Sequence, residues 1–434
     1  MSSAEPPLHA LSLGEAAASI ARGTLTARAL ADAQLARIAA TDGPIGAWVA
    51  LDPAHVRAEA DRCDATPSRG ALAGIGIGVK DIIDTHDFPT QMGSTAYAGR
   101  RSERDAQCVA RLRAAGGYVF GKTVTTELAF MHPGRTRNPW NAAHTPGGSS
   151  SGSAAAVAAG HVAGAIGTQT NGSVIRPAAY CGIVGYKPSA GAIPYAGVNV
   201  FSETLDTLGA FTRSVRDAAL LAGVLAEPGA IALSRFEEPP TLAVLPQFPW
   251  SPVDAATREA LAAASRSLEA GGAHVVNVTL PSGWNDAPAV LRTIMLAEAA
   301  RNLALVRQLH GAQFSATLND ALDEGARISP SDYRSALARR ARMIAEVADW
   351  LGSFDAIVTP SVPAPAPAGI ATTGDPACCT LWSLLGAPAV NLPIALDQAG
   401  LPLGVQFAGR PGDDARLLGV AAWCEARLPF AARP

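Results

Sequence analysis

Two loops rich in glycine and serine carry the residues best suited to chemistry. The first spans residues 146–153 and reads Pro-Gly-Gly-Ser-Ser-Ser-Gly-Ser, and the second ends at Ser173. Because small residues let successive backbone N–H groups converge, the second loop can form an oxyanion hole for acyl transfer, with Ser173 as the nucleophile. The backbone N–H groups assigned to that hole are those of Thr170, Asn171, Gly172 and Ser173.

Lys80 is the candidate for the base, because a serine hydroxyl is a weak nucleophile at its ordinary pKa and needs one. It ends an apolar stretch, residues 75–79, in which isoleucine and valine alternate with glycine. Burial there would disfavour the ammonium form and lower the lysine pKa, so that the neutral amine could accept a proton. The histidines lie among apolar or helical residues without distinctive surroundings; the three considered are His161, His274 and His310.

The same residues also have structural interpretations. Lys80 could form a buried ion pair with Asp81 or Asp84, and Ser173 could cap a helix. Taken singly, each residue favours its structural role. Their joint spacing, with two glycine-rich loops around them, favours catalysis.

Two other motif matches compete with this interpretation. Residues 116–123 match the phosphate-loop pattern GxxxxGK[ST] letter for letter. A phosphate loop follows a strand and opens a helix, whereas the Tyr-Val-Phe inside this match favours a strand, so we interpret it as a chance match. Residues 148–152 match the GxSxG elbow of α/β-hydrolases, with Ser150 at its centre. An esterase that uses Ser150 therefore stays open as an alternative.

Composition favours an enzyme acting on a small molecule. The 434 residues are 48% hydrophobic and 16% charged, with a net charge of −3, so the chain can bury a large core and shows no footprint for nucleic acid. Its apolar runs are too short to span a membrane, and residues 1–10 lack the features of a secretory signal. We expect a cytoplasmic protein with no nucleic-acid or membrane partner, and a homodimer stays open.

No metal or cofactor is expected. The six cysteines are scattered without a CxxC pair, and the eight histidines show neither HxH nor HExxH spacing. Free, buried thiols are the expected state of the cysteines.

The elements that must position these residues alternate between helices and strands, as in an α/β sheet protein. Residues 11–62 have helical periodicity, with Thr24 or Thr26 as a cap, and a helix is expected over 331–351 with Ser331 and Asp332 at its start. Further helices are expected at 105–115, 215–225, 254–270 and 414–426, and strands at 75–79, 118–120, 242–245, 274–278, 355–358, 390–392 and 403–407.

The sequence resembles the amidase signature family. The resemblance covers most of the chain and is weakest over residues 230–350. The segments that carry it are 145–160, 167–182 and 185–188, upstream 78–81, 92–94 and 121–123, and downstream 206–209, 386–389 and 400–404.

The resemblance implies an amidase signature fold, in which one large mixed, twisted sheet is covered by helices on both faces. It also implies a Ser-cisSer-Lys triad: Ser173 as nucleophile, Ser149 as the bridging serine after a cis peptide bond, and Lys80 as base. Lys80 would take a proton from Ser149, and Ser149 from Ser173, which would attack an amide carbonyl. Water would then hydrolyse the acyl-enzyme.

Two departures from the family pattern bear on the substrate. Asn171 stands where the family usually has glycine, and asparagine is the other residue that best tolerates positive φ. Arg176 lies three residues after the nucleophile, as in the malonamidase-like branch, where this arginine receives a substrate carboxylate. A structural arginine bonded to backbone carbonyls is weighed equally. We assign Arg176, Ser150 and Gln169 to substrate binding.

The expected activity is therefore hydrolysis of a small amide, with a carboxylate on the substrate as one option. The alternative within the family is the glutaminase subunit of a tRNA-dependent amidotransferase, which works inside a complex. One amidase domain over 1–434 is expected, with a helical layer at 1–65, the signature core at 66–230, a variable helical region at 231–352 and return strands with a final helix at 353–434.

Overall fold

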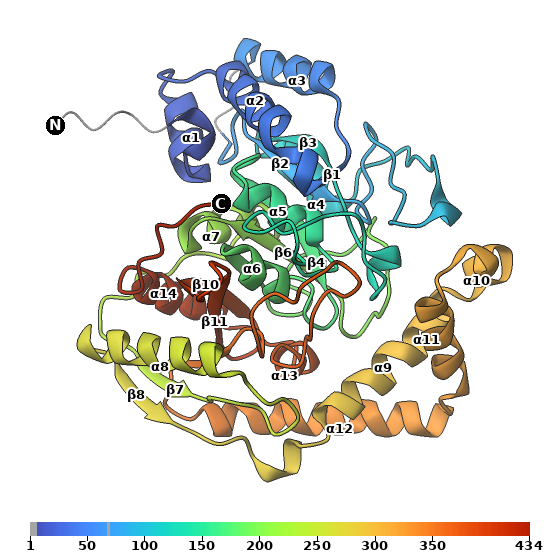
Figure 1. Ribbon diagram of the computed structural model, residues 1–434, viewed down its shortest axis with the longest axis vertical. Coiled ribbons are helices and arrows are strands. Elements are labelled where there is room, and N and C mark those ends of the chain that lie inside the picture. The colour runs from blue at the N-terminus through green and yellow to red at the C-terminus, as the bar shows by residue number, and fades with distance from the viewer. Residues whose placement is uncertain (1–6, 67–69) are drawn as a thin grey trace.

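A computed structural model describes residues 7–66 and 70–434 (Figure 1). Two segments lie outside the described residues. They are residues 1–6, at the start of the expected helical layer and of the N-terminus expected to lack a signal, and residues 67–69, at the start of the expected core. Eleven strands form one sheet in the order β1-β3-β2-β4-β6-β5-β10-β11-β9-β7-β8. Parallel pairs join β2 to β3 and β4, and β7 to β8 and β9, while the remaining pairs are antiparallel. The large mixed sheet is thus confirmed.

The strands follow the chain in short segments. They are β1 (Trp48–Ala50), β2 (Gly76–Lys80), β3 (Tyr118–Thr123), β4 (Gly164–Gln169), β5 (Val184–Lys187), β6 (Thr207–Thr212), β7 (Thr241–Val244), β8 (His274–Asn277), β9 (Ala356–Pro360), β10 (Ala389–Leu396) and β11 (Pro402–Ala408).

The α-helices lie between these strands. They are α1 (Leu13–Ala21), α2 (Ala27–Ile45), α3 (Pro53–Ala65), α4 (Gln107–Ala114), α5 (Ser151–Ala158), α6 (Ile175–Cys181), α7 (Val215–Leu225), α8 (Ala255–Ala270), α9 (Ala287–Asn302), α10 (Ala304–His310), α11 (Ala316–Arg327), α12 (Pro330–Leu351), α13 (Thr380–Leu384) and α14 (Asp414–Glu425).

Helices cover both faces of the sheet because successive strand residues point to opposite sides. On β4, Ile166 belongs to the apolar cluster that includes α4 and α7, and its neighbour Ala165 belongs to the cluster that includes α2 and α5. On β6, Ala210 and Phe211 divide between the same two clusters. The residues of these strands are buried on both sides, which is why they lack the polar alternation of a half-exposed strand.

Most expected helices are present. The helix at 215–225 is confirmed, and the side chain of its N-cap, Ser214, accepts a hydrogen bond from the Asp217 N–H. Thr26 caps α2. The expected cap of the long helix is wrong, because α12 begins at Pro330 and the Ser329 side chain accepts from the Asp332 N–H.

The helical interpretation of residues 11–62 is wrong over three residues. Trp48–Ala50 form the edge strand β1, antiparallel to the end of β3. Gly46, in the left-handed conformation, ends α2 before it, and Asp52 begins α3 after it. A strand this short has no periodicity to read, so pairing with β3 decides its conformation.

The phosphate-loop match at 116–123 is confirmed as chance, since residues 118–123 are the buried strand β3. Within the expected variable helical region 231–352, the helices α9 to α12 lie in residues 287–351 and extend away from the sheet in Figure 1. Among the described helices, none combines the length and the apolarity needed to cross a bilayer.

Candidate active site

Lys80 is the last residue of β2 and is fully buried. Its Nζ lies 2.7 Å from Ser149 Oγ and 2.7 Å from Thr168 Oγ1. Register explains the second contact, because β2 pairs in parallel with β4 and Val79 lies opposite Ile166. Two adjacent parallel strands therefore end at the same place, the edge where α/β proteins build their sites.

The structural interpretation of Lys80 fails. Asp81 pairs with Lys122, 3.5 Å away, and Asp84 pairs with Arg100. Among residues 7–66 and 70–434, no ion pair involves Lys80. Burial accordingly lowers the pKa of Lys80 well below its usual 10.5, and the negative charge of Asp206 opposes this only in part. A lysine in this setting can act as a base.

Ser149 precedes α5 and follows a cis peptide bond from Gly148, as the family resemblance implied. Its side chain is buried. The loop closes tightly on neighbouring segments, since a Cβ on Gly148 would approach Thr373 Cγ2 to 2.8 Å. Larger residues cannot occupy this turn without displacing its neighbours.

Ser173 lies in the turn between β4 and α6 and is 8% exposed. It does not cap α6, whose N-cap is Val174 and has no side-chain cap bond. Within the described chain, its hydroxyl has no hydrogen-bond partner, and no bond joins it to Ser149. The hydroxyl can therefore turn toward Ser149 or toward a bound substrate.

The turn presents three successive donors. Among the described residues, the backbone N–H groups of Asn171, Gly172 and Ser173 have no acceptor. A Cβ on Gly172 would lie 2.9 Å from Pro376 Cβ, so this position requires glycine. Three unpaired amides beside a serine hydroxyl are the arrangement that stabilises a tetrahedral oxyanion.

The conformational reason offered for Asn171 is wrong, because its φ is not positive. Its side chain instead accepts a hydrogen bond from Thr380 Oγ1 at 3.0 Å. Its carbonyl oxygen accepts a bond from the Ser383 hydroxyl. Asparagine is held here by side-chain and backbone bonding to α13.

Two residues assigned to substrate binding have side chains that form hydrogen bonds with other groups of the protein. Ser150 Oγ donates to the Thr168 carbonyl and accepts from its N–H. Gln169 Oε1 accepts from the N–H groups of Val174 and Ile175, and Nε2 donates to Ser383 Oγ. Neither residue lines the cavity at Ser173. This geometry indicates that Ser150 and Gln169 support the structure of the site. It also disfavours Ser150 as an esterase nucleophile.

Arg176 lies on α6 and is buried. Its Nε and Nη2 donate to the Gly148 carbonyl at 3.2 and 2.7 Å, and Nη1 donates to the Gly374 carbonyl at 2.8 Å. These are the backbone bonds of the structural interpretation, yet the residue also lines the cavity. One guanidinium therefore fixes the peptide before Ser149 and leaves further N–H groups for a ligand.

A cavity lies beside Ser173. Its wall is largely apolar, with Phe130 stacked on Phe201 at a centroid distance of 5.2 Å. Met295 reaches it from α9. The site therefore combines one cation and three amide donors with an apolar wall. The lining residues are Ala129, Phe130, Met131, Thr170, Asn171, Gly172, Ser173, Arg176, Phe201, Met295 and Pro376.

Sequence reasoning missed two polar residues behind the site. Thr168 is the second partner of Lys80. Asp206 accepts a bond from Thr170 Oγ1 at 2.6 Å and from the N–H groups of Phe201 and Ser202. Burial raises the pKa of Asp206 to about 6. The family-like segment 206–209 was the available signal, but only the fold places Asp206 beside the turn.

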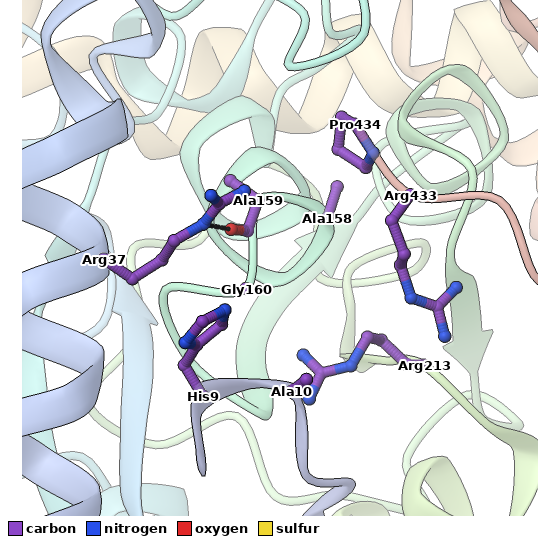
Figure 2. Close-up of a pocket in the computed structure, with 9 residues that line it drawn as sticks. All are labelled: His9, Ala10, Arg37, Ala158, Ala159, Gly160, Arg213, Arg433 and Pro434. Atoms are coloured by element: carbon purple, nitrogen blue, oxygen red, sulfur yellow. Dashed lines mark hydrogen bonds between the residues drawn. The ribbon is translucent and has the colours of Figure 1, made fainter. Parts of the chain in front are cut away.

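Figure 2 shows a second cavity, whose lining residues do not include Lys80, Ser149 or Ser173. Arg37 Nε donates to the Ala159 carbonyl, and Arg213 donates to the Val162 carbonyl. These arginines satisfy carbonyl groups at and after the C-terminal end of α5. The cavity is lined by His9, Ala10, Arg37, Ala158, Ala159, Gly160, Arg213, Arg433 and Pro434.

The histidines are structural or remote. His161 is buried and accepts a hydrogen bond from Trp48 Nε1 at 3.2 Å. Among the residues in the described ranges, no three His, Cys, Asp or Glu side chains are grouped so that they could hold a metal ion. The six cysteines are free thiols.

Comparisons with known proteins identify the family and the fold. The family described as Amidase matches residues 29–418. A glutamyl-tRNA(Gln) amidotransferase subunit of Roseiflexus castenholzii is 33% identical over 95% of both chains. A crystal structure of an amidase superposes with a TM-score of 0.88 at 32% identity, covering 96% of this chain and 100% of the other. The peptide amidase from Stenotrophomonas maltophilia gives 0.83 at 29% identity, covering 99% and 98%.

Proposed function

This chain belongs to the amidase family, and we propose that it hydrolyses the C–N bond of a small amide through an acyl-enzyme on Ser173. The single observation that carries the proposal is the buried contact of Lys80 Nζ with Ser149 Oγ, at 2.7 Å, by a lysine without an ion-pair partner among the described residues. An ammonium would be costly there, so the neutral amine is the resident base.

The reaction begins with proton transfer. Neutral Lys80 takes the Ser149 proton while Ser149 takes the proton of Ser173, whose Oγ forms a bond to the amide carbonyl carbon. The carbonyl π electrons move onto oxygen, and the amides of residues 171–173 donate to that oxyanion. The contact of Ser173 with Ser149 forms when substrate orders the hydroxyl, as hydrogen bonds in active sites often tighten in the complex.

The relay then runs backwards. The proton held by Lys80 returns through Ser149 to the leaving nitrogen, the C–N bond breaks, and ammonia or an amine departs. Water attacks the ester on Ser173 while its proton enters the same relay, and collapse of the second tetrahedral intermediate releases the carboxylic acid. Two serines and one lysine thus act as base and acid in turn.

Single alanine replacements test the triad. Lys80→Ala, Ser149→Ala and Ser173→Ala are each expected to lower kcat/KM by about 10³-fold or more, because general base and nucleophile are lost. Ser265→Ala is the matched control, since among the described residues this hydroxyl bonds only to the Leu261 carbonyl on α8. Near-normal amide hydrolysis by Ser173→Ala would refute the mechanism.

We further propose that Arg176 receives a carboxylate of the substrate, as in the malonamidase-like branch. The support is its place in the cavity wall beside Ser173 and the absence of an acidic partner within the described chain. A planar guanidinium suits bidentate binding of a carboxylate.

Arg176→Gln separates substrate binding from support of Gly148. Loss of support affects all amides equally, whereas loss of the charge affects only anionic ones. We expect KM for the monoamide of a dicarboxylic acid to rise about 10- to 100-fold more than KM for the matching alkyl amide. An equal change for both substrates would assign the arginine to support alone.

A second candidate function comes from the relatives named as subunits of glutamyl-tRNA(Gln) amidotransferase, which match this chain over nearly its full length. In that role the chain would release ammonia from glutamine inside a complex. The same relay and oxyanion turn would serve, so the substrate and the need for a partner distinguish the two candidates.

A further inference from the structure

The turn that carries the three free amides has no regular structure of its own. Residues 170–174 connect β4 to α6, and the helical bonds that reach them are those from the Arg176 and Ala178 N–H groups to the Gly172 and Val174 carbonyls. An oxyanion hole works only if its donors are fixed before reaction, because reorientation during reaction would consume the stabilisation. Other groups must therefore hold this turn.

Gln169 holds the turn from one side. Its Oε1 accepts from Val174 N at 2.8 Å and from Ile175 N at 3.0 Å, so its side chain bridges the two ends of the turn. Its Nε2 donates to Ser383 Oγ at 3.0 Å. Gln169 and Ser383 are almost completely buried, so water does not compete for these bonds.

The short helix α13 holds the turn from the other side. Ser383 Oγ donates to the Asn171 carbonyl while accepting from Gln169, which uses its single donor and one acceptor site. Thr380, one turn earlier, donates to Asn171 Oδ1 at 3.0 Å. The Asn171 peptide is thereby fixed on its carbonyl side, and the same peptide plane carries the Gly172 N–H.

We propose that Ser383 is a positioning residue for the oxyanion hole, which aims the amides of residues 171–173 through Asn171 and Gln169. Ser383 touches neither the cavity nor Ser173, and it acts through the peptide planes of the turn. The inference rests on the proposed function, because it assumes that Ser173 forms the tetrahedral intermediate.

Ser383→Ala removes the hydroxyl that joins Asn171 to Gln169. We expect kcat to fall about 10- to 100-fold with KM changed less than about twofold, because misplaced donors weaken transition-state binding more than substrate binding. Affinity for an aldehyde analogue of the substrate, which forms a tetrahedral adduct on Ser173, should fall by a similar factor. Ser383→Thr retains the hydroxyl and should restore most of kcat.

The matched control is Ser189→Ala. Ser189 is also buried, and its hydroxyl accepts from the Gly412 N–H, far along the chain. This variant should keep kcat and aldehyde affinity. If Ser383→Ala does not fold, Thr380→Val removes the second bond to Asn171, and a smaller loss of kcat at constant KM is expected.

Unchanged kcat in a folded Ser383→Ala, or equal losses in substrate and aldehyde binding, would overturn the positioning role. Failure of the proposed function is a different result: the wild-type chain would show no amide hydrolysis, or Ser173→Ala would remain active. Ser383→Ala therefore tests the positioning role, whereas the wild-type chain and Ser173→Ala test the proposed function.

Discussion

At the scale of single residues, a comparison of two buried lysines shows which surroundings allow a lysine to act as a base. Lys122 and Lys80 both lie at the ends of neighbouring strands and are both withdrawn from water. Lys122 has Asp81 at 3.5 Å and donates to the Ile83 carbonyl, and burial lowers its pKa only to about 8. Lys80 has hydroxyl partners in place of a carboxylate, and burial lowers its pKa well below 10.5.

The first prediction concerns pH. Lys80 acts when neutral, which requires a pH above its pKa, so kcat/KM should rise with pH and level off. Because burial lowers that pKa, the midpoint of the rise should fall well below 10.5. Lys80→Arg keeps the cation but cannot deprotonate, and should lose about 10³-fold at every pH. A midpoint near 10.5, or activity in Lys80→Arg, would contradict the assignment.

The second prediction concerns Thr168, the other partner of Lys80. Thr168→Val keeps the shape and removes the hydroxyl that lies 2.7 Å from Nζ. We expect kcat to fall about tenfold, because Nζ is no longer directed toward Ser149. The midpoint of the pH profile should also move to lower pH, since a partner of the ammonium form is lost.

Thr168→Ser supplies the control because it retains the hydroxyl on a smaller side chain. It should recover most of kcat and the original midpoint. Equal activity of Thr168→Val and wild type would show that Lys80 needs no second partner.

At the scale of elements, the helical region connects to the site through buried carboxylates. Glu298 on α9 accepts from the Ser202 hydroxyl, from Thr204 and from Tyr333 of α12. Met295, one turn earlier on α9, lines the cavity at Ser173. The helices thus supply part of the wall and secure the loop that carries Phe201.

The third prediction tests this connection. Glu298→Ala leaves the buried Ser202 hydroxyl and the half-buried donors of Thr204 and Tyr333 without an acceptor, and it should lower the free energy of unfolding by about 3 kcal/mol, measured by urea denaturation. KM should rise because Phe201 and Met295 lose their support. Glu324→Ala is the control, since Glu324 pairs with Arg292 at the surface and should change stability by less than about 1 kcal/mol. If the two variants lowered the free energy of unfolding equally, Glu298 would contribute no more to stability than a surface ion pair.

At the scale of the whole molecule, one chain supplies every part of the site. Lys80 ends β2, the turn follows the adjacent parallel strand β4, and α13 comes from more than 200 residues later. One continuous sheet contains β2 and β4, and α13 precedes β10 of the same sheet (Figure 1). The residues that we propose for catalysis and for the oxyanion turn therefore all belong to one chain.

The fourth prediction follows from that. The purified chain alone should release ammonia from small amides with a turnover on the order of 1–100 s⁻¹. Ammonia release, with light scattering to give the number of copies, measures this, and Ser173→Ala from the same preparation controls for contaminating amidases. Activity on glutamine that appears only with a partner protein would favour the amidotransferase role.

Much of this could be predicted before the fold was known. The small residues at 146–153 and 170–173 limited the loops to tight turns, and the apolar stretch before Lys80 indicated a buried strand end. Local cues could not identify the three-residue β1. The true cap of α12 did have a local signal, because Ser329 is followed by Pro330 at the first helical position. Local cues also could not show that Ser150 and Gln169 are occupied by neighbouring backbone groups, because those partners depend on packing.

The sequence by itself determined the kind of chemistry, since the residue types and spacings of Lys80, Ser149 and Ser173 carry the family resemblance. Only the tertiary structure decided which groups stand around them. Asp81 pairs with Lys122, so Lys80 has no ion-pair partner in the described part of the chain, and α13 holds the oxyanion turn through Ser383. The physical reason is that a pKa and an aligned amide depend on burial and on neighbours distant in sequence, which only folding brings together.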